Sequence, residues 1–320
     1  MSTSSDIPFQ QLLDALLNQD IPFHPRYLYR LSDLDGDELH SLENAWPKVS
    51  VWRRQALLED LEEIGETDFV LSFEAIGRLA LQDEDPKVRM TAVRVLWEYE
   101  SPDLIPIFIK IMQTDSDAGV RAMAASALGR FVYLGEVDKL AAGARAQVEE
   151  NLLRVAQGED LPSVRRRALE SLGYSGRAEV PGLIEKAYAS GNREWLISAL
   201  IAMGRSANNR WEKRVLSMLV NRAPMVRSEA ARAAGELELS AARETLIELL
   251  QDEEEDVRLA AIWSLSQIGG RGVREALEEM QEQAEDDDEV DYLENALDNL
   301  AFTEDMGMFS MFQLSDDDLD

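Results

Sequence analysis

The stretch that decides the fold is DPKVRMTAVRVL, residues 85–96. Within it Val88, Ala92 and Leu96 are four residues apart, so they lie on one face of an α-helix. The side chain of Asp85 can accept amide protons left free at the start of this helix, and Pro86 suits its first turn. Asp117 stands at the matching place before Val120. We therefore predict a helix that buries this stripe and whose small alanine lets a neighbouring helix approach closely.

The same frame returns along the chain and identifies an internal repeat. A Val-Arg pair, or a substitute for it, is followed four residues later by a small residue and eight or nine residues later by Leu or Gly. The first position of the frame, called the anchor below, falls at residues 52, 88, 120, 164, 195, 226, 257 and 290. Glycine at the ninth position after the anchor, as in Gly129 and Gly235, suits the end of such a helix.

An apolar stretch precedes these helices, as in LIPIFI at 104–109 and TLIELL at 245–250. Each repeat is therefore predicted to be a helix, a short turn and a second helix, and such a pair cannot bury its apolar face alone. The sequence predicts an all-α superhelix of about seven to eight stacked helical hairpins. The longer gap between the anchors at 120 and 164 predicts a loop or an extra turn near 133–146.

Three regions follow from the extent of the frame. The repeat array is expected over residues 46–300. Residues 1–45 do not fit the frame and are expected to form a helical N-terminal cap or docking extension, since the exposed end of an array must be covered. Residues 301–320 are expected to form an acidic, disordered tail that carries a short apolar motif.

The D-x-x-V-R-x-x-A-x-x-x-L-G frame of these repeats resembles the HEAT-repeat family, in the short version of about 31 residues that is also found in phycobilin lyases. The resemblance implies an α-solenoid whose second helices line a concave face. It implies fold far more strongly than function, because this fold carries many activities.

The residue types needed for catalysis are scarce. The chain has no cysteine, which removes thiolate metal sites and cysteine nucleophiles, and its two histidines, His24 and His40, both lie in the N-terminal extension. Deoxyhypusine hydroxylases, which are HEAT-type enzymes, hold iron with His-Glu pairs, and no such pair occurs in this sequence. We therefore assign no catalytic residue, no cofactor and no metal ligand.

The net charge of −30 disfavours nucleic acid and anionic membranes as partners, because binding to both depends on Lys and Arg. The charge is also uneven: residues 161–232 hold 13 Lys/Arg against 6 Asp/Glu, whereas residues 275–320 hold 18 Asp/Glu and no Lys/Arg. Neither a signal peptide nor an apolar run of the ~20 residues that a membrane span needs is visible, so a cytoplasmic location is expected.

Candidate binding residues come from positions that avoid the apolar stripe. Offsets of two, three, six and ten residues from each anchor are expected to face solvent on the second helices. In the basic region these positions hold a cluster of arginines with a tryptophan, residue types that dominate interface energies. The candidates are Arg166, Arg167, Arg205, Arg232 and Trp263.

The tail supplies a second set of candidates. Phe309, Phe312 and Leu314 lie among acidic residues without a core of their own, which is typical of a short linear motif that orders on binding. Two alternatives stay open: the tail docks in cis on the basic region 161–232, or it docks in trans on another protein.

The sequence thus favours a non-catalytic adaptor or scaffold that binds a protein with an acidic or mixed acidic and apolar surface. The alternative is an enzyme or enzyme subunit of the phycobilin-lyase-like HEAT group, which would attach a chromophore or cofactor. That alternative is implied only by the resemblance.

Overall fold

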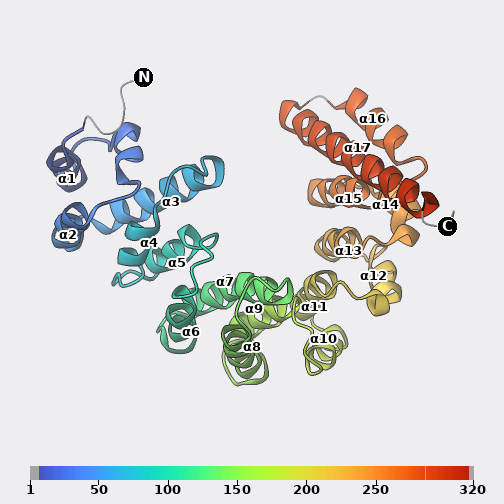
Figure 1. Cartoon of the computed structure of the whole chain (residues 1–320), viewed down its shortest axis with the longest axis horizontal. Coiled ribbons are helices and arrows are strands. Elements are labelled where there is room, and N and C mark those ends of the chain that lie inside the picture. The colour runs from blue at the N-terminus through green and yellow to red at the C-terminus, as the bar shows by residue number, and fades with distance from the viewer. Residues whose placement is uncertain (1–6, 285, 317–320) are drawn as a thin grey trace. The chain divides into compact units, whose positions relative to one another are not determined.

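The computed structural model describes residues 7–284 and 286–316, with side chains through Phe302. The described residues form helices and no β-strand, so the predicted all-α solenoid of paired helices is confirmed (Figure 1). The chain divides into two compact units, Met1–Ser171 and Leu172–Asp320, which are described separately below. Within the described residues, no helix combines the length and the apolar character that a membrane crossing requires.

The first unit alternates first and second helices of successive pairs. The second helices α3, α5 and α7 pack side by side, and α4, α6 and α8 cover one side of this row. The α-helices are α1 (Phe9–Leu17), α2 (Gly36–Ala45), α3 (Val51–Thr67), α4 (Glu74–Ala80), α5 (Pro86–Val95), α6 (Leu104–Thr114), α7 (Ala118–Glu136), α8 (Ala142–Gln157) and α9 (Pro162–Leu172). Short 3-10 helices lie at Pro25–Tyr27, Tyr29–Leu31 and Trp46–Lys48.

The second unit repeats this alternation. The second helices α11, α13, α15 and α17 pack in order, and each is paired with the helix that precedes it. The α-helices are α10 (Val180–Tyr188), α11 (Arg193–Arg205), α12 (Glu212–Met218), α13 (Pro224–Glu236), α14 (Arg243–Leu249), α15 (Glu255–Ile268), α16 (Val273–Gln283) and α17 (Asp287–Asp316). Short 3-10 helices lie at Asn209–Trp211 and Ser240–Ala242.

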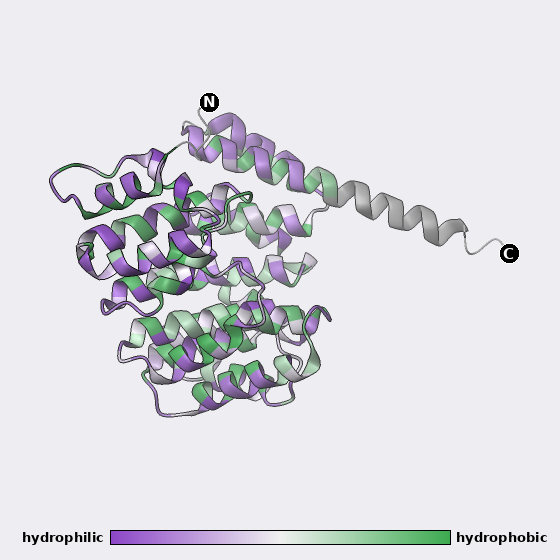
Figure 2. Cartoon of the chain, turned by 60° about the vertical axis from the view of Figure 1, so that its left-hand side comes forward, coloured by the Kyte–Doolittle hydropathy of each residue, from purple (hydrophilic) through white to green (hydrophobic). Residues whose placement is uncertain are grey.

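The predicted stripe forms the core of both units. Hydrophobic and hydrophilic residues alternate along the helices (Figure 2), as expected where each helix buries one face. The side chains of Asp85 and Asp117 accept hydrogen bonds from the amides of Val88 and Val120, each at 3.0 Å, so the predicted helix starts are confirmed. The anchor, fourth and eighth positions of three repeats are fully buried: Val88, Ala92, Leu96, Val120, Ala124, Leu128, Val257, Ala261 and Leu265.

The arginine that follows the anchor valine links neighbouring repeats. Arg89 donates to both carboxylate oxygens of Asp115, at 2.8 and 2.7 Å, and its Nη1 donates to the carbonyl oxygen of Asp83 at 2.8 Å. One side chain therefore closes the turn of its own repeat and holds the turn of the next. The same two-oxygen pairing joins Arg121 to Asp160 and Arg227 to Asp252.

The glycines at the ninth position mostly lie at helix ends, as predicted, but without a left-handed turn. Gly204 and Gly235 come one residue before the ends of α11 and α13, whereas Gly129 lies inside α7, and none has a positive φ. Each is a point of close approach. A Cβ atom added to Gly235 would lie 2.9 Å from the Cα of Ser264 and 2.7 Å from Cζ3 of Trp263, both on α15.

The two terminal copies of the frame are offset from the predicted register. At the first copy Trp52 is 53% exposed, and Arg53, Leu57 and Leu61 are buried in its place, so the anchor falls at 53 rather than 52. At the last copy Leu293 is buried whereas Glu294 is exposed. A repeat at the end of an array packs against a neighbour on one side only, so its sequence is free to depart from the frame.

The N-terminal extension packs on the first repeat through Arg53. The Nη2 atom of this buried arginine donates to the carbonyl oxygens of Asn18 and Ile21, each at 2.8 Å. Leu12 and Leu16 of α1 are fully buried, as expected for an amphipathic helix. The extension thus contacts α3 through a buried side chain, and its role as a cap or a docking extension stays a prediction.

The extra residues between the anchors at 120 and 164 lengthen two helices. The helices α7 and α8 have 19 and 16 residues, whereas α5 has 10 and α9 has 11. Only a short connection at 137–141 separates α7 from α8. The insertion therefore adds helical turns, and a long loop near 133–146 is absent from this described region.

Candidate functional site

The second helices expose a narrower face than the offsets from the anchors predicted. Ser198, Ser228, Ala260 and Glu170 were expected to face solvent, and all four are buried. In the second unit, α11 packs against α13 and α13 against α15, so the small residues Ser198, Ser228 and Ala260, at the second or third offset, lie between neighbouring second helices. In the repeats anchored at 195, 226 and 257, side chains at the sixth and tenth offsets stay at least partly accessible, whereas Glu170, at the sixth offset after the anchor at 164, is buried and pairs with Arg167.

In the second unit these accessible positions bring together aromatic and charged side chains. The guanidinium carbon of Arg205, at the end of α11, lies 5.1 Å from the ring centre of Tyr174, a distance typical of a cation–π contact. The carboxyl end of Glu236 lies over Gly204, which leaves room for it because it has no side chain. Tyr174, Arg205 and Glu236 all occupy the tenth offset of consecutive repeats, so they form a row.

Glu236 was not among the sequence candidates, although its offset of ten from the anchor at 226 was the available signal. The residue as a whole is exposed, but its carboxyl end is enclosed by neighbouring atoms near Gly204. Burial of this end raises the pKa of Glu236 to about 7; Arg205 opposes the rise, Glu229 adds to it, and Arg232 opposes it. The charge of this surface therefore changes near neutral pH.

This shift has a measurable consequence for stability. Between the ordinary pKa of a glutamate and about 7, the unfolded chain loses the proton that folded Glu236 keeps, so this group makes the free energy of unfolding fall as pH rises. In the wild type, we expect this group to lower the free energy of unfolding by about 1 kcal/mol between about pH 5 and about pH 8, a value reduced for solvent screening. In Glu236→Gln this decrease should be absent. Urea denaturation at several pH values measures it, with the exposed Glu244→Gln as control; parallel curves for wild type and Glu236→Gln would contradict the prediction.

Arg232 and Trp263 continue the surface on α13 and α15. Arg232 is exposed and forms no hydrogen bond or ion pair with the residues that the structure describes. Trp263 is half-buried, because part of its ring packs against Gly235 while the rest stays accessible. Beside them, the hydroxyl of Tyr292 on α17 donates to the carbonyl oxygen of Leu259 at 3.3 Å.

The other two arginine candidates lie in the first unit, on α9. Arg167 is exposed and pairs with the buried Glu170, with 2.6 Å between Nη1 and Oε2. Arg166 is half-buried and has interaction partners of its own. The five candidates are therefore divided between the units: Arg166 and Arg167 in the first, and Arg205, Arg232 and Trp263 in the second.

The tail candidates cannot be placed. The backbone of α17 continues to Asp316, past the boundary at 301 that the sequence predicted for a disordered tail. The side chains of Phe309, Phe312 and Leu314 lie outside the described residues. Docking of the tail on residues 161–232 or on another protein stays a prediction.

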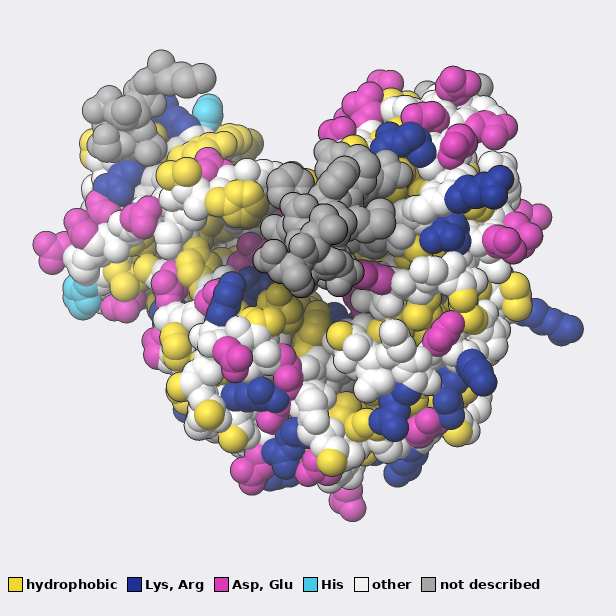
Figure 3. Space-filling view, turned by 45° about the vertical axis from the view of Figure 1, so that its right-hand side comes forward, with side chains coloured by type: hydrophobic (Ala, Val, Ile, Leu, Met, Phe, Trp, Pro, Cys, Tyr) yellow, Lys and Arg dark blue, Asp and Glu magenta, His cyan; other side chains and the backbone are white. Residues whose placement is uncertain are grey.

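The charge asymmetry of the sequence is visible in the second unit. As drawn in Figure 3, acidic side chains gather at the upper end of this unit, and Lys and Arg side chains are spread among apolar ones lower down.

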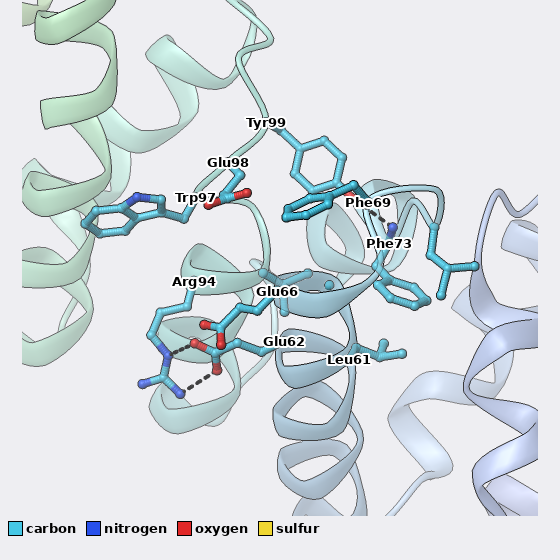
Figure 4. Close-up of a pocket in the computed structure, with 12 residues that line it drawn as sticks. Leu61, Glu62, Glu66, Phe69, Phe73, Arg94, Trp97, Glu98 and Tyr99 are labelled. Atoms are coloured by element: carbon cyan, nitrogen blue, oxygen red, sulfur yellow. Dashed lines mark hydrogen bonds and ion pairs between the residues drawn. The ribbon is translucent and has the colours of Figure 1, made fainter. Parts of the chain in front are cut away.

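A pocket of about 440 Å³ lies in the first unit, and the sequence did not predict it. It lies between the end of α3, the loop that follows, and the segment after α5 (Figure 4). Its lining combines four aromatic side chains with three glutamates and one arginine: Phe69, Phe73, Trp97, Tyr99, Glu62, Glu66, Glu98 and Arg94.

The described residues contain no obvious constellation for metal binding. No group of three or more His, Asp or Glu side chains among them is arranged to hold a metal ion. The ring of His24 accepts a hydrogen bond from the amide of Arg26 at 3.2 Å, and the ring of His40 lies 3.6 Å from the carboxylate of Glu43, both at the surface.

Comparison with known families agrees with the repeat. A family model described as HEAT repeats matches residues 74–158 and 212–301, more than half of the chain. The protein therefore belongs to the HEAT-repeat family, and the family expected from the frame is confirmed. No curated protein sequence matches the chain significantly.

Several solved structures are similar to this chain at low sequence identity. CpcE and CpcF of phycocyanin lyase from Nostoc are 17% identical, over 92% of this chain and 95% of that chain, with a TM-score of 0.45. Human deoxyhypusine hydroxylase is 19% identical, over 83% of this chain and 96% of that chain, with a TM-score of 0.36. Kap95, solved in complex with Nup1, is 14% identical, over 96% of this chain and 48% of that chain, with a TM-score of 0.45.

Proposed function

We propose that this protein is a non-catalytic adaptor that binds a partner protein through the second helices of its second unit. One observation carries the proposal: Arg232, which is exposed and forms no hydrogen bond or ion pair among the described residues, lies on α13 between α11, which carries Arg205, and α15, which carries Trp263. Arginine and tryptophan on adjacent helices combine charge with accessible apolar surface, the composition of binding hot spots.

The supporting helices make this surface suitable for recognition. The helices α11, α13 and α15 are fixed against one another by buried small residues and by the hydrogen bond from Ser264 Oγ to the carbonyl oxygen of Ala231, at 2.7 Å. A rigid surface loses little conformational entropy when a partner binds. The partner that fits is a protein segment with carboxylates next to apolar side chains, since Arg205 and Arg232 supply the complementary charge.

The test compares the double variant Arg205→Ser, Arg232→Ser with the wild-type chain. We expect the variant to bind its partner at least ~10-fold more weakly, because buried interface arginines each contribute on the order of 1–2 kcal/mol. The partner is captured from lysate of the source organism on the full chain, identified by mass spectrometry, and its affinity is then measured with purified proteins.

The matched control is Arg193→Ser, Arg222→Ser, which removes the same charge from exposed positions elsewhere in the second unit. Equal affinity of the wild type and the Arg205, Arg232 variant would reject this surface. A separate variant, Arg166→Ser with Arg167→Ser, measures the contribution of α9. The competing proposal, an enzyme or enzyme subunit that attaches a chromophore or cofactor, predicts covalent transfer when a bilin and an acceptor protein are added.

A further inference from the structure

The pocket of the first unit lies where the repeat anchored at Val88 has a tryptophan at its ninth position. The ninth position after the anchor is glycine in four other repeats, at 129, 173, 204 and 235, but it is Trp97 after the anchor Val88. Here α5 ends at Val95, and the amide of Tyr99 donates to the carbonyl oxygen of Leu96 at 3.2 Å, so the chain turns away from the helix. Because no helical turn continues beside the end of α3, a space stays open there.

Aromatic side chains form the walls of this space and are held in place. Phe73, 2% exposed, lies at its base, and Phe69, on the same loop, is 82% exposed. The hydroxyl of Tyr99 accepts a hydrogen bond from the amide of Phe73 at 2.8 Å, which fastens the loop to the segment after α5. The exposed phenyl ring of Phe69 thus belongs to an anchored loop. Its contact with water is unfavourable, and a partner that buried the ring would gain free energy.

The charges in the pocket are not balanced. Glu62 is paired with Arg94, which donates to its two carboxylate oxygens at 2.6 and 2.9 Å. Glu66 and Glu98 are exposed and form no ion pair with any residue in the described part of the chain. In the view of Figure 4, Glu98 lies between Trp97 and the ring of Phe69, and the carboxylate of Glu66 lies below it, beside that of Glu62.

Carboxylates beside aromatic rings favour a ligand that carries a positive charge next to an apolar group. Two uncompensated carboxylates attract a positive charge, and the faces of Trp97, Tyr99 and Phe69 can hold it by cation–π contact. Leu61 and Phe73 offer apolar surface for the side chain beside it. An acidic segment is disfavoured here, which includes residues 301–320 of this chain, because they contain six Asp/Glu and no Lys/Arg.

We propose that this pocket binds a segment of a partner protein in which a Lys or Arg side chain stands next to an apolar side chain. The site differs from the surface on α11, α13 and α15 in its unit, its lining and the sign of its charge. It stands independently of the function proposed for that surface. A chain with both sites would bind a basic segment and an acidic segment at separate places.

The experiment selects binders from a library of short random peptides displayed on phage, with the full chain as bait. The peptides recovered are expected to combine Lys or Arg with Leu, Ile, Met or an aromatic residue. Synthetic copies of these peptides should bind the double variant Glu66→Gln, Glu98→Gln at least ~10-fold more weakly than wild type. The same loss is expected for the single variant Phe69→Ala. All three substituted side chains are exposed, so these variants are expected to keep the fold.

Two controls separate this site from others. The variant Glu278→Gln, Glu282→Gln removes two exposed carboxylates from α16 and should bind the peptides as wild type does. The variant Arg205→Ser, Arg232→Ser should also bind them normally, whatever its effect on an acidic partner. Loss of binding in either control would place the peptides elsewhere and overturn the proposal.

Other results would overturn it as well. These are recovery of peptides without a basic residue, equal affinity for the Glu66, Glu98 variant and the wild type, and competition by a synthetic peptide of residues 303–320. Analytical ultracentrifugation tests the alternative that a second copy of the chain occupies the pocket. The proposal expects the same mass for wild type and the Glu66, Glu98 variant, and a dimer that the substitutions dissociate would contradict it.

Discussion

Replacing Asp83 by alanine should lower the free energy of unfolding of the first unit by about 3–5 kcal/mol. The carboxylate of Asp83 is buried and accepts hydrogen bonds from Nη1 of Arg54 at 2.6 Å and from Nε1 of Trp46 at 2.7 Å. Arg54 is itself 3% exposed. Without its partner, the guanidinium keeps its charge in surroundings that cannot solvate it, and the Trp46 ring loses its acceptor.

Glu84 provides the matched control for this prediction. Its carboxylate lies 3.4 Å from Nη2 of the same Arg54, but its side chain is 82% exposed. Glu84→Ala should therefore change the free energy of unfolding by less than ~1 kcal/mol, the value typical of a surface ion pair. The comparison of the two variants separates burial from charge, because each removes one carboxylate next to the same arginine.

Hydrogen exchange measured by mass spectrometry gives the regional readout that a repeat array requires, since repeats can unfold in parts. In Asp83→Ala, amide protection should fall in α2, α3 and α4, which surround the pair, and should persist in α13 and α15 of the second unit. Urea denaturation gives the total change. An Asp83→Ala variant as stable as Glu84→Ala would show that Arg54 finds another partner or reaches solvent.

The core could be predicted from sequence because it depends on local spacing. Val88, Ala92 and Leu96 are spaced four residues apart, so any α-helix places them on one face, whatever packs against it. Burial of that face follows from the need to cover apolar area, so the stripe, the helix starts at Asp85 and Asp117, and the all-α solenoid were within reach.

Features that depend on a neighbouring repeat were out of reach. Glycine at the ninth position was assigned to a helix end, and Gly235 does lie one residue before the end of α13, but the close approach of Ser264 and Trp263 from the next pair was not foreseen. The register of Arg53 was missed because its partners come from the N-terminal extension. Both features depend on contacts between segments far apart in sequence.

The candidate site was predicted in part. The offsets identified Arg205, Arg232 and Trp263 as accessible residues of adjacent second helices in one unit. They did not reveal that Glu170 is buried or that Glu236 belongs to the surface, because the enclosure of a long side chain depends on the gap between two helices. The pocket had a visible signal, Trp97 in place of glycine, whose meaning required knowing what that glycine does.

Replacing Gly235 by valine should lower the free energy of unfolding of the second unit by about 3 kcal/mol. Two effects compete at this position, which lies inside α13. Loss of glycine favours the helix by up to ~1 kcal/mol, whereas a side chain here meets the Cα of Ser264, which cannot move without shifting α15. The steric effect wins because the obstacle is backbone and because the α13–α15 interface is extensive.

Gly182→Ala supplies the opposite case and so tests the physical reason. Gly182 also lies inside a helix, α10, but a Cβ added there would meet no atom within 4 Å. This variant should gain about 0.5–1 kcal/mol from helix propensity and from the lower entropy of the unfolded chain. Urea denaturation of both variants decides between the two effects: if Gly235→Val were as stable as wild type, α13 and α15 would be able to separate without loss, and close packing at the ninth position would not be what selects glycine.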